Sequence, residues 1–160
     1  EARAIELGFA TRTLSNELQG EAREVARWIA KKAMEAKASL PRKDRKKICL
    51  ISGGETTVTV KGSGKGGRNT ELALAFALAI QGIQGISLLS AGTDGTDGPT
   101  DAAGAIVDGE TVTKAGLLGL SASDCLANND SYSFFRETGE LLITGPTGTN
   151  VMDLQIILVD

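Results

Sequence analysis

The sequence predicts an α/β fold in which helices sandwich a mixed β-sheet. Short, continuous apolar runs of strand length alternate with longer segments that have helical periodicity. Glycine-rich and polar loops separate the two kinds of segment. A chain of 160 residues with 41% hydrophobic and 23% charged residues has the composition of one ordinary globular core.

Residues 1–46 predict a helix end, a strand, a helix and a basic loop. The strand is expected near Gly8 to Leu14, and apolar residues between 20 and 38 recur at the i, i+3, i+4 spacing of an amphipathic helix. That helix must end before Pro41. The run of five cations and one anion at 42–47 is interpreted as a solvated loop in preference to a phosphate-binding patch. Because the chain begins with Glu1, we expect a piece of a larger protein.

Residues 48–60 predict two paired strands. Ile48 to Ile51 is a continuous apolar run, typical of a strand buried on both faces. Val58 and Val60 alternate with polar residues, so the second strand should have one buried face. Only the segment 53–55 separates the two strands, which is too short for a crossover between parallel strands. We therefore expect an antiparallel hairpin.

The remaining elements follow from the same patterns. A nearly all-apolar stretch at 69–80 predicts a buried helix, and Ser123 and Asn129 or Asp130 are candidate caps of two short helices between 121 and 139. The other expected elements are strands at 86–90, 105–107, 141–144 and 154–159 and a helix at 110–117.

The glycine-rich loop before the buried helix matches G-x-G-x-x-G at Gly62, Gly64 and Gly67. A dinucleotide turn needs a buried parallel strand before it and an acid about 20 residues after it. The expected hairpin and an Asp94 that lies 27 positions after Gly67 argue against that function, and Arg68 breaks the Walker A pattern. We predict instead an anion site at a helix N-terminus. Its candidate residues are Lys65, Gly66, Gly67, Arg68 and Asn69.

The alternative for this loop is purely structural. Asn69 would cap the helix, and Arg68 would pair with a carboxylate instead of gripping an oxyanion bidentately.

Two further polar loops follow apolar strands. Asp94, Asp97 and Asp101 offer hard oxygen ligands suited to Mg²⁺ beside a phosphate, although turn chemistry explains Asp97 equally well. The loop after residue 143 offers uncharged donors for an anion or for sugar-like hydroxyls, or else only a tight turn. Its candidate residues are Thr147, Gly148, Thr149 and Asn150.

Composition excludes several classes of function. The chain has no histidine, so Ser-His and Cys-His nucleophile pairs and histidine metal sites are excluded. Cys49 and Cys125 are interpreted as free thiols. Residues 48–160 carry 5 basic and 13 acidic residues, which argues against a nucleic acid partner. No apolar run approaches the ~20 residues of a membrane span, and no secretory signal is present, so we expect a cytoplasmic protein.

Four motifs resemble, in order, the C-terminal MOFRL domain of the glycerate 2-kinase family, formerly labelled hydroxypyruvate reductase. They are GGETTVTVKGSGKGGRNTELALAFA, LLSAGTDGTDGPTDAAGAIVDG, NNDSYSFF and TGPTGTNVMDLQIILV. The resemblance covers residues 47–160, the MOFRL-type α/β domain. Residues 1–46 are similar to the lead-in that belongs to the rest of such an enzyme.

The resemblance implies the C-terminal domain of a two-domain α/β enzyme that transfers the γ-phosphate of ATP to D-glycerate with Mg²⁺ in a cleft between its domains. It implies that Arg68 is an active-site residue and that Asp94, with its neighbouring carboxylates, lines the cleft. The family's N-terminal domain is absent from this chain and is an expected partner, as is a second copy in a homodimer. We therefore predict that the chain alone has no kinase activity.

Two alternatives stay open. One is a reductase of hydroxypyruvate that uses NAD(P)H, which the G-x-G-x-x-G pattern invites but the expected hairpin opposes. The other is a non-catalytic module that binds a small molecule and keeps the fold without the chemistry.

Overall fold

The computed structural model describes residues 1–40 and 47–160. Most of the basic run predicted as a loop, residues 42–46, lies outside this range. The elements, in order, are α1 (Ala2–Glu6), β1 (Phe9–Glu21), α2 (Ala22–Ser39), β2 (Lys47–Thr57), α3 (Arg68–Ala79), β3 (Ile86–Gly92), β4 (Gly104–Asp108), α4 (Thr111–Leu117), α5 (Ala122–Ala127), α6 (Ser131–Thr138), β5 (Leu141–Leu142) and β6 (Asp153–Val159).

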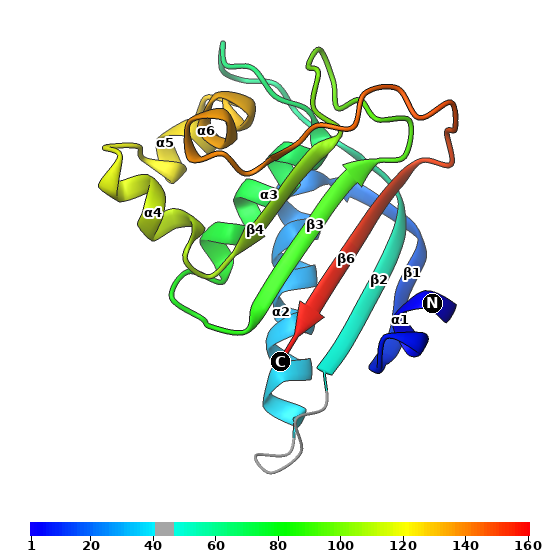
Figure 1. Ribbon diagram of the computed structural model, residues 1–160. Coiled ribbons are helices and arrows are strands. Elements are labelled where there is room, and N and C mark those ends of the chain that lie inside the picture. Colours follow the sequence, from blue (N-terminus) through cyan, green and yellow to red (C-terminus); the bar gives the residue numbers. More distant parts are fainter. Residues whose placement is uncertain (41–46) are drawn as a thin grey trace.

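Six strands form one mixed sheet in the order β1-β2-β6-β3-β4-β5. β1 and β2 pair in parallel, and the other pairs are antiparallel. Helices α2 and α3 pack side by side behind the sheet, and α1 lies on the opposite side at the β1 edge (Figure 1). The predicted α/β fold with a mixed sheet flanked by helices is confirmed.

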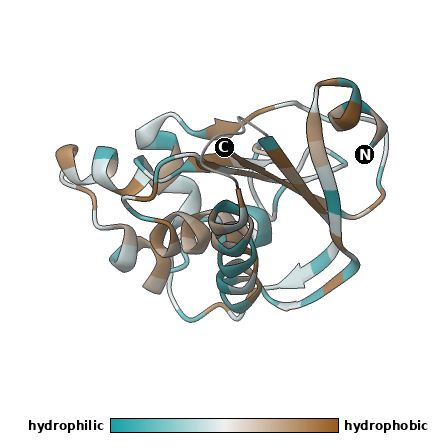
Figure 2. Ribbon diagram, turned by 90° about the horizontal axis from the view of Figure 1, so that it is seen from below, coloured by the Kyte–Doolittle hydropathy of each residue, from teal (hydrophilic) through white to brown (hydrophobic). Residues whose placement is uncertain are grey.

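The two long helices, α2 and α3, differ in how much of their surface is buried. α2 turns a stripe of small residues inward, including Ala22, Ala26, Ala30 and Ala33, and its charged residues face solvent. α3 is enclosed on nearly all sides, with Leu72, Leu74 and Phe76 fully buried. Figure 2 shows this difference as a helix with a teal face beside a mostly brown one. Both helices occur where their periodicity predicts them.

The predicted hairpin at 48–60 is wrong. β2 runs unbroken from Lys47 to Thr57, and Gly53 and Gly54 pair with Leu154 and Asp153 of β6. A side chain on Gly54 would place Cβ 2.3 Å from the backbone nitrogen of Leu18, where β1 is irregular in register. Gly54 therefore marks a close approach of two backbones, and neither glycine forms a turn.

Without that hairpin, the segment before the glycine-rich loop no longer differs from the strand that a dinucleotide loop needs. Both β2 and β3 are antiparallel to β6, so they are parallel to each other and α3 connects them. The glycine-rich loop thus does follow a strand of a β-α-β unit. Its function must be judged from its contacts.

Smaller differences concern element ends. The strand expected at 141–144 is limited to Leu141–Leu142, and Ser121 rather than Ser123 caps α5 by accepting from the amide of Asp124. Asp130 takes the predicted N-cap position of α6. Cys49 and Cys125 are free thiols, as predicted. Within residues 1–40 and 47–160, no helix has both the length and the apolar character that crossing a bilayer requires.

Candidate active-site cleft at Arg68

A cleft of about 870 Å³ opens where β1 and β2 end and α3 begins. Its walls come from the irregular part of β1, the end of β2, the first turn of α3 and the residue before β6. Among the predicted site residues, it reaches Arg68 and Gly67. The lining residues are Asn16, Glu17, Leu18, Gln19, Gly54, Glu55, Thr56, Thr57, Val58, Gly67, Arg68, Gly98 and Met152.

Arg68 is held by two carboxylates. Its Nε and Nη2 donate to Asp153 Oδ2 at 2.7 Å and Oδ1 at 3.0 Å, and its Nη1 donates to Glu55 Oε1 at 2.6 Å. The hydrogen bonds to Asp153 raise the pKa of the guanidinium above its ordinary value, so Arg68 stays charged. Arg68 thus pairs with carboxylates, as the structural alternative for this loop expects, and its side chain nevertheless keeps 35% of its surface exposed.

Asp97 fills the predicted anion site at the start of α3. Its Oδ1 accepts from the amide of Asn69 at 2.8 Å, and its Oδ2 accepts from the amide and the hydroxyl of Thr70, both at 2.8 Å. Burial raises the pKa of Asp97, and these hydrogen bonds oppose that rise. Asp97 is therefore a cap supplied from a distant loop, and the backbone amide of Asn69 is not free for a phosphate.

The glycine loop is clamped by Asn128–Asp130, which we call the NND segment. A Cβ on Gly62 would lie 2.2 Å from the carbonyl oxygen of Asn128, and one on Gly64 would lie 2.3 Å from Cβ of Asp130. The two glycines are thus required by packing against the protein itself. The segment accepts from Lys61 N, Gly62 N, Ser63 N, Gly64 N and Lys65 N.

Lys65 contributes its side chain to a surface group. Its Nζ lies 4.4 Å from the ring centroid of Tyr132, whose hydroxyl donates to Asp101 Oδ1 at 2.7 Å. This hydrogen bond lowers the pKa of Asp101 and keeps it ionised. Tyr132 therefore contacts both Lys65, through its ring, and Asp101, through its hydroxyl.

Asp94 lies in the loop after β3 and makes its hydrogen bonds apart from the group of Lys65, Tyr132 and Asp101. The amide of Thr96 donates to its Oδ1 at 3.0 Å, and this bond, with one from the Thr96 hydroxyl, lowers the pKa of Asp94. Within the described residues, no group of three Asp, Glu or Cys side chains is placed to hold one metal ion. Asp94, Asp97 and Asp101 thus do not form one group, because each carboxylate faces its own partner, and their binding of Mg²⁺ stays a prediction.

The loop between β3 and β4 (residues 93–103) and the loop between β5 and β6 (residues 143–152) lie together above β3 and β6 in Figure 1. Thr147 donates from its amide to Asp94 O at 3.1 Å and from its hydroxyl to Thr93 O at 2.6 Å. Asn150 Nδ2 reaches Asp94 Oδ2 at 3.5 Å. The predicted binding residues Thr147, Gly148, Thr149 and Asn150 are all exposed.

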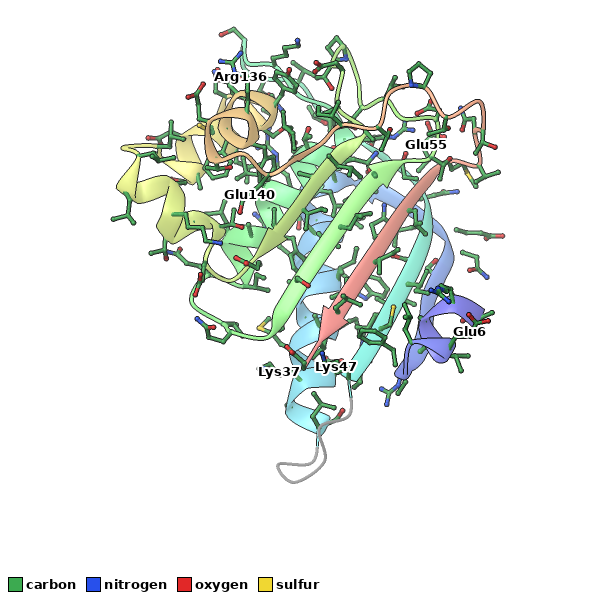
Figure 3. All side chains as sticks on the ribbon, viewed as in Figure 1. Glu6, Lys37, Lys47, Glu55, Arg136 and Glu140 are labelled. Atoms are coloured by element: carbon green, nitrogen blue, oxygen red, sulfur yellow. The ribbon has the colours of Figure 1, made fainter. Side chains whose placement is uncertain are left out.

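The sequence analysis missed both carboxylates that hold Arg68: Glu55, which lines the cleft, and the buried Asp153. Asp153 occupies a buried position in the strand pattern that continues with Gln155 and Ile157, and this signal could have revealed it. Glu55 carried no such signal, because the hairpin interpretation placed it in a turn. Figure 3 labels Glu55 at the loop-bearing end of the sheet, near the start of β6.

A second arginine is bound to the first turn of α3. Arg23 Nε donates to Glu71 Oε1 at 2.6 Å, and Arg23 Nη2 donates to Leu126 O at 2.7 Å. Asn129 Nδ2 donates to Glu71 Oε2 at 2.8 Å. This group joins α2, α3 and the NND segment.

Comparison with known proteins adds a family. The profile of the MOFRL family matches residues 48–153. A D-glycerate 2-kinase of Thermotoga maritima is 53% identical over 156 residues, which are 98% of this chain and 37% of that protein. A glycerate 2-kinase of Pyrococcus horikoshii is 41% identical over 98% of this chain and 35% of its own length.

A crystal structure of glycerate kinase from Thermotoga maritima superposes with a TM-score of 0.94 at 53% identity, covering 99% of this chain and 38% of that one. The chain thus corresponds to the C-terminal part of these relatives and spans little more than a third of their length.

Proposed function

Because the chain belongs to the MOFRL family, we propose that it is the C-terminal part of a glycerate kinase, which transfers the γ-phosphate of ATP to D-glycerate. The observation that carries the proposal is Arg68, a permanently charged guanidinium that is fixed at the wall of an open cleft. Phosphoryl transfer needs positioned charge more than covalent chemistry by the protein. An arginine on the γ-phosphate or on the glycerate carboxylate meets that need.

The orientation of Arg68 supports this role. Asp153 engages Nε and Nη2 with both carboxylate oxygens, which fixes the plane of the guanidinium. Nη1 is left on the side of Glu55, whose side chain is 54% exposed and lines the cleft. We propose that the anionic part of a substrate is bound there.

A kinase needs Mg²⁺ with its ATP, and the donor set allows only a small contribution from this chain. Mg²⁺ in kinases is typically held by one or two carboxylates together with phosphate oxygens and water. Asp94 fits as one such ligand, because it is partly exposed and its lowered pKa keeps it ionised. When bound, the ion neutralises phosphate charge. Asp97 does not fit, since it is buried as a helix cap.

For the nucleotide we propose exposed polar residues of the loop between β5 and β6, Thr147, Thr149 and Asn150 with Gly148, together with the ammonium of Lys65. The backbone of the glycine loop contributes less than its composition suggests, because the NND segment takes the amides of residues 61–65. Of the predicted loop residues, Gly66 and Gly67 are left as candidate contacts beside Arg68.

The other partner that we propose is the N-terminal domain of a longer enzyme. The chain corresponds to 35–38% of the length of the relatives from Thermotoga maritima and Pyrococcus horikoshii. The face of the sheet opposite α2 and α3 carries apolar side chains that keep substantial exposure, including Ile106 at 47% and Leu158 at 38%. A second domain would cover such a face and complete the site. We therefore expect the 160-residue chain alone to be inactive.

We also propose the cytoplasm as the compartment of the protein and a homodimer as its assembly. Light scattering of the purified protein would test for the homodimer.

The test is a two-domain chimera in which this chain replaces the matching C-terminal part of the Thermotoga maritima relative. We expect phosphorylation of D-glycerate that depends on ATP and Mg²⁺. A folded chimera that lacks this activity would favour the non-catalytic module. Oxidation of NADH with hydroxypyruvate, measured in parallel, would instead revive the reductase.

A further inference from the structure

The two carboxylates on Arg68 are held very differently. Asp153 is 1% exposed, binds through both oxygens, and is fixed by its backbone position at the start of β6 opposite Gly54. Glu55 is 54% exposed and binds through one oxygen, at 2.6 Å from Nη1. One counter-ion is thus part of the folded core, and the other is attached from the surface.

This difference determines which contact can be exchanged. The pair of Arg68 with Asp153 has one fully buried member and two hydrogen bonds, whereas a half-exposed ion pair contributes little and is readily replaced by solvent or by another anion. Glu55 also lines the cleft, so a departing side chain has open space before it. An incoming oxyanion would bind Nη1 of a guanidinium whose orientation is already fixed by Asp153.

We propose that Glu55 is a displaceable counter-ion, which closes the anion site at Arg68 Nη1 until a phosphate or carboxylate group of a ligand takes its place. Asp153 is the positioning residue that keeps the guanidinium in the same orientation in both states. The identity of the ligand as a kinase substrate rests on the proposed function, but the exchange of Glu55 for an oxyanion does not.

Inorganic phosphate is the probe, titrated into the 160-residue chain while the NMR signal of Arg68 Nε–H is followed. Glu55→Gln removes the competing charge, and we expect phosphate to bind about two- to fivefold more tightly, the range that a half-exposed ion pair supplies. Asp153→Asn should weaken binding, because the guanidinium loses its fixed plane. Circular dichroism checks that each variant is folded.

Glu137→Gln is the matched control, because Glu137 is 56% exposed and pairs with Arg136 away from the cleft. It should leave phosphate binding unchanged. Unchanged or weaker binding in Glu55→Gln would overturn the proposal, as would the absence of any phosphate response at Arg68 in both the parent chain and this variant. A response that appears only in Glu55→Gln supports it.

The outcome is separable from that of the kinase assay. Tighter phosphate binding in Glu55→Gln with no glycerate phosphorylation by the chimera would leave the counter-ion exchange standing and remove the proposed function. An active chimera in which Glu55→Gln has no effect on phosphate binding would do the reverse.

Discussion

Two arginines are bound by carboxylates around the first turn of α3, and they have opposite surroundings. Arg23 donates to Glu71, which is 2% exposed, and to the carbonyl of Leu126, so its polar contacts lie within the protein. Arg68 has a buried partner in Asp153 and a surface partner in Glu55. The ion-pair chemistry is the same, but only Arg68 opens onto a cleft.

The second partner thus distinguishes a structural arginine, Arg23, from a candidate functional one, Arg68. Arg68 and Glu71 both belong to the first turn of α3, yet Arg68 lines the cleft and Glu71 is buried. Breaking the two groups should therefore affect different properties of the protein: activity for Arg68 and stability for Arg23 with Glu71.

The largest expected effect is that of Arg68→Ala in the two-domain chimera. Loss of a cation that stabilises transferring phosphate should lower kcat/KM roughly a thousandfold, which is about 4 kcal/mol. Steady-state kinetics with D-glycerate and ATP measure it, and thermal unfolding measures the separate loss of stability that is expected because the buried Asp153 loses its partner. A variant that keeps more than a tenth of the parent activity would contradict the assignment of Arg68 to the site.

Glu71→Ala should act on stability. It leaves Arg23 and the side-chain amide of Asn129 without their buried acceptor, and the free energy of unfolding should fall by about 3 kcal/mol. Urea denaturation of the 160-residue chain measures this change. The matched control is Glu110→Ala on the exposed start of α4, which should cost less than about 0.5 kcal/mol. Equal effects of the two substitutions would argue against the structural role of the Arg23 group.

Asp97→Ala should destabilise the chain by about 2 kcal/mol, since the amides of Asn69 and Thr70 lose a charged acceptor at a buried helix start. Denaturation again provides the measurement. Asp97→Asn keeps one acceptor oxygen and should cost less than the alanine variant. If the alanine variant were as stable as the parent, Asp97 would be available as a ligand after all.

The smallest expected effect is that of Tyr132→Phe, which removes the hydrogen bond to Asp101. Because the folded-state pKa of Asp101 lies below its ordinary value of 3.8, its stabilisation is present above that pH and is lost as the pH falls through the lowered pKa. The raised pKa of Tyr132 has the opposite sense, so its share is lost as the pH rises past 10. The unfolding temperatures of the parent and the variant should therefore differ at pH 7 and converge at both extremes. A difference that is independent of pH would rule out this pair as its source.

The sequence predicts most of the fold because the long elements carry strong periodicity. The apolar run of α3 and the buried strands β3 and β6 lie within a few residues of their expected bounds. The hairpin failed because Gly53 and Gly54 were interpreted as a turn. Gly54 is required by the backbone of Leu18, more than thirty residues earlier, and the local sequence contains no trace of that contact.

The same limit applies to the site. Arg68 was found because a charged residue after glycines at a helix start is a local pattern. Glu55 and Asp153, which set its state, come from β2 and β6 and meet Arg68 only in the fold. The capping role of Asp97 was not predicted, because a buried cap and a metal ligand have the same local sequence, and its burial becomes visible only in the fold.

The clamp on the glycine loop has a consequence for conformational entropy. Residues 61–67 contain four glycines and would be among the most disordered stretches of the unfolded chain. In the folded chain the NND segment holds them through backbone amides, so that entropy is lost during folding and not during ligand binding. Amide hydrogens of Lys61, Gly62 and Lys65 should therefore exchange with solvent slowly, at rates closer to those of a helix than to those of a flexible glycine linker.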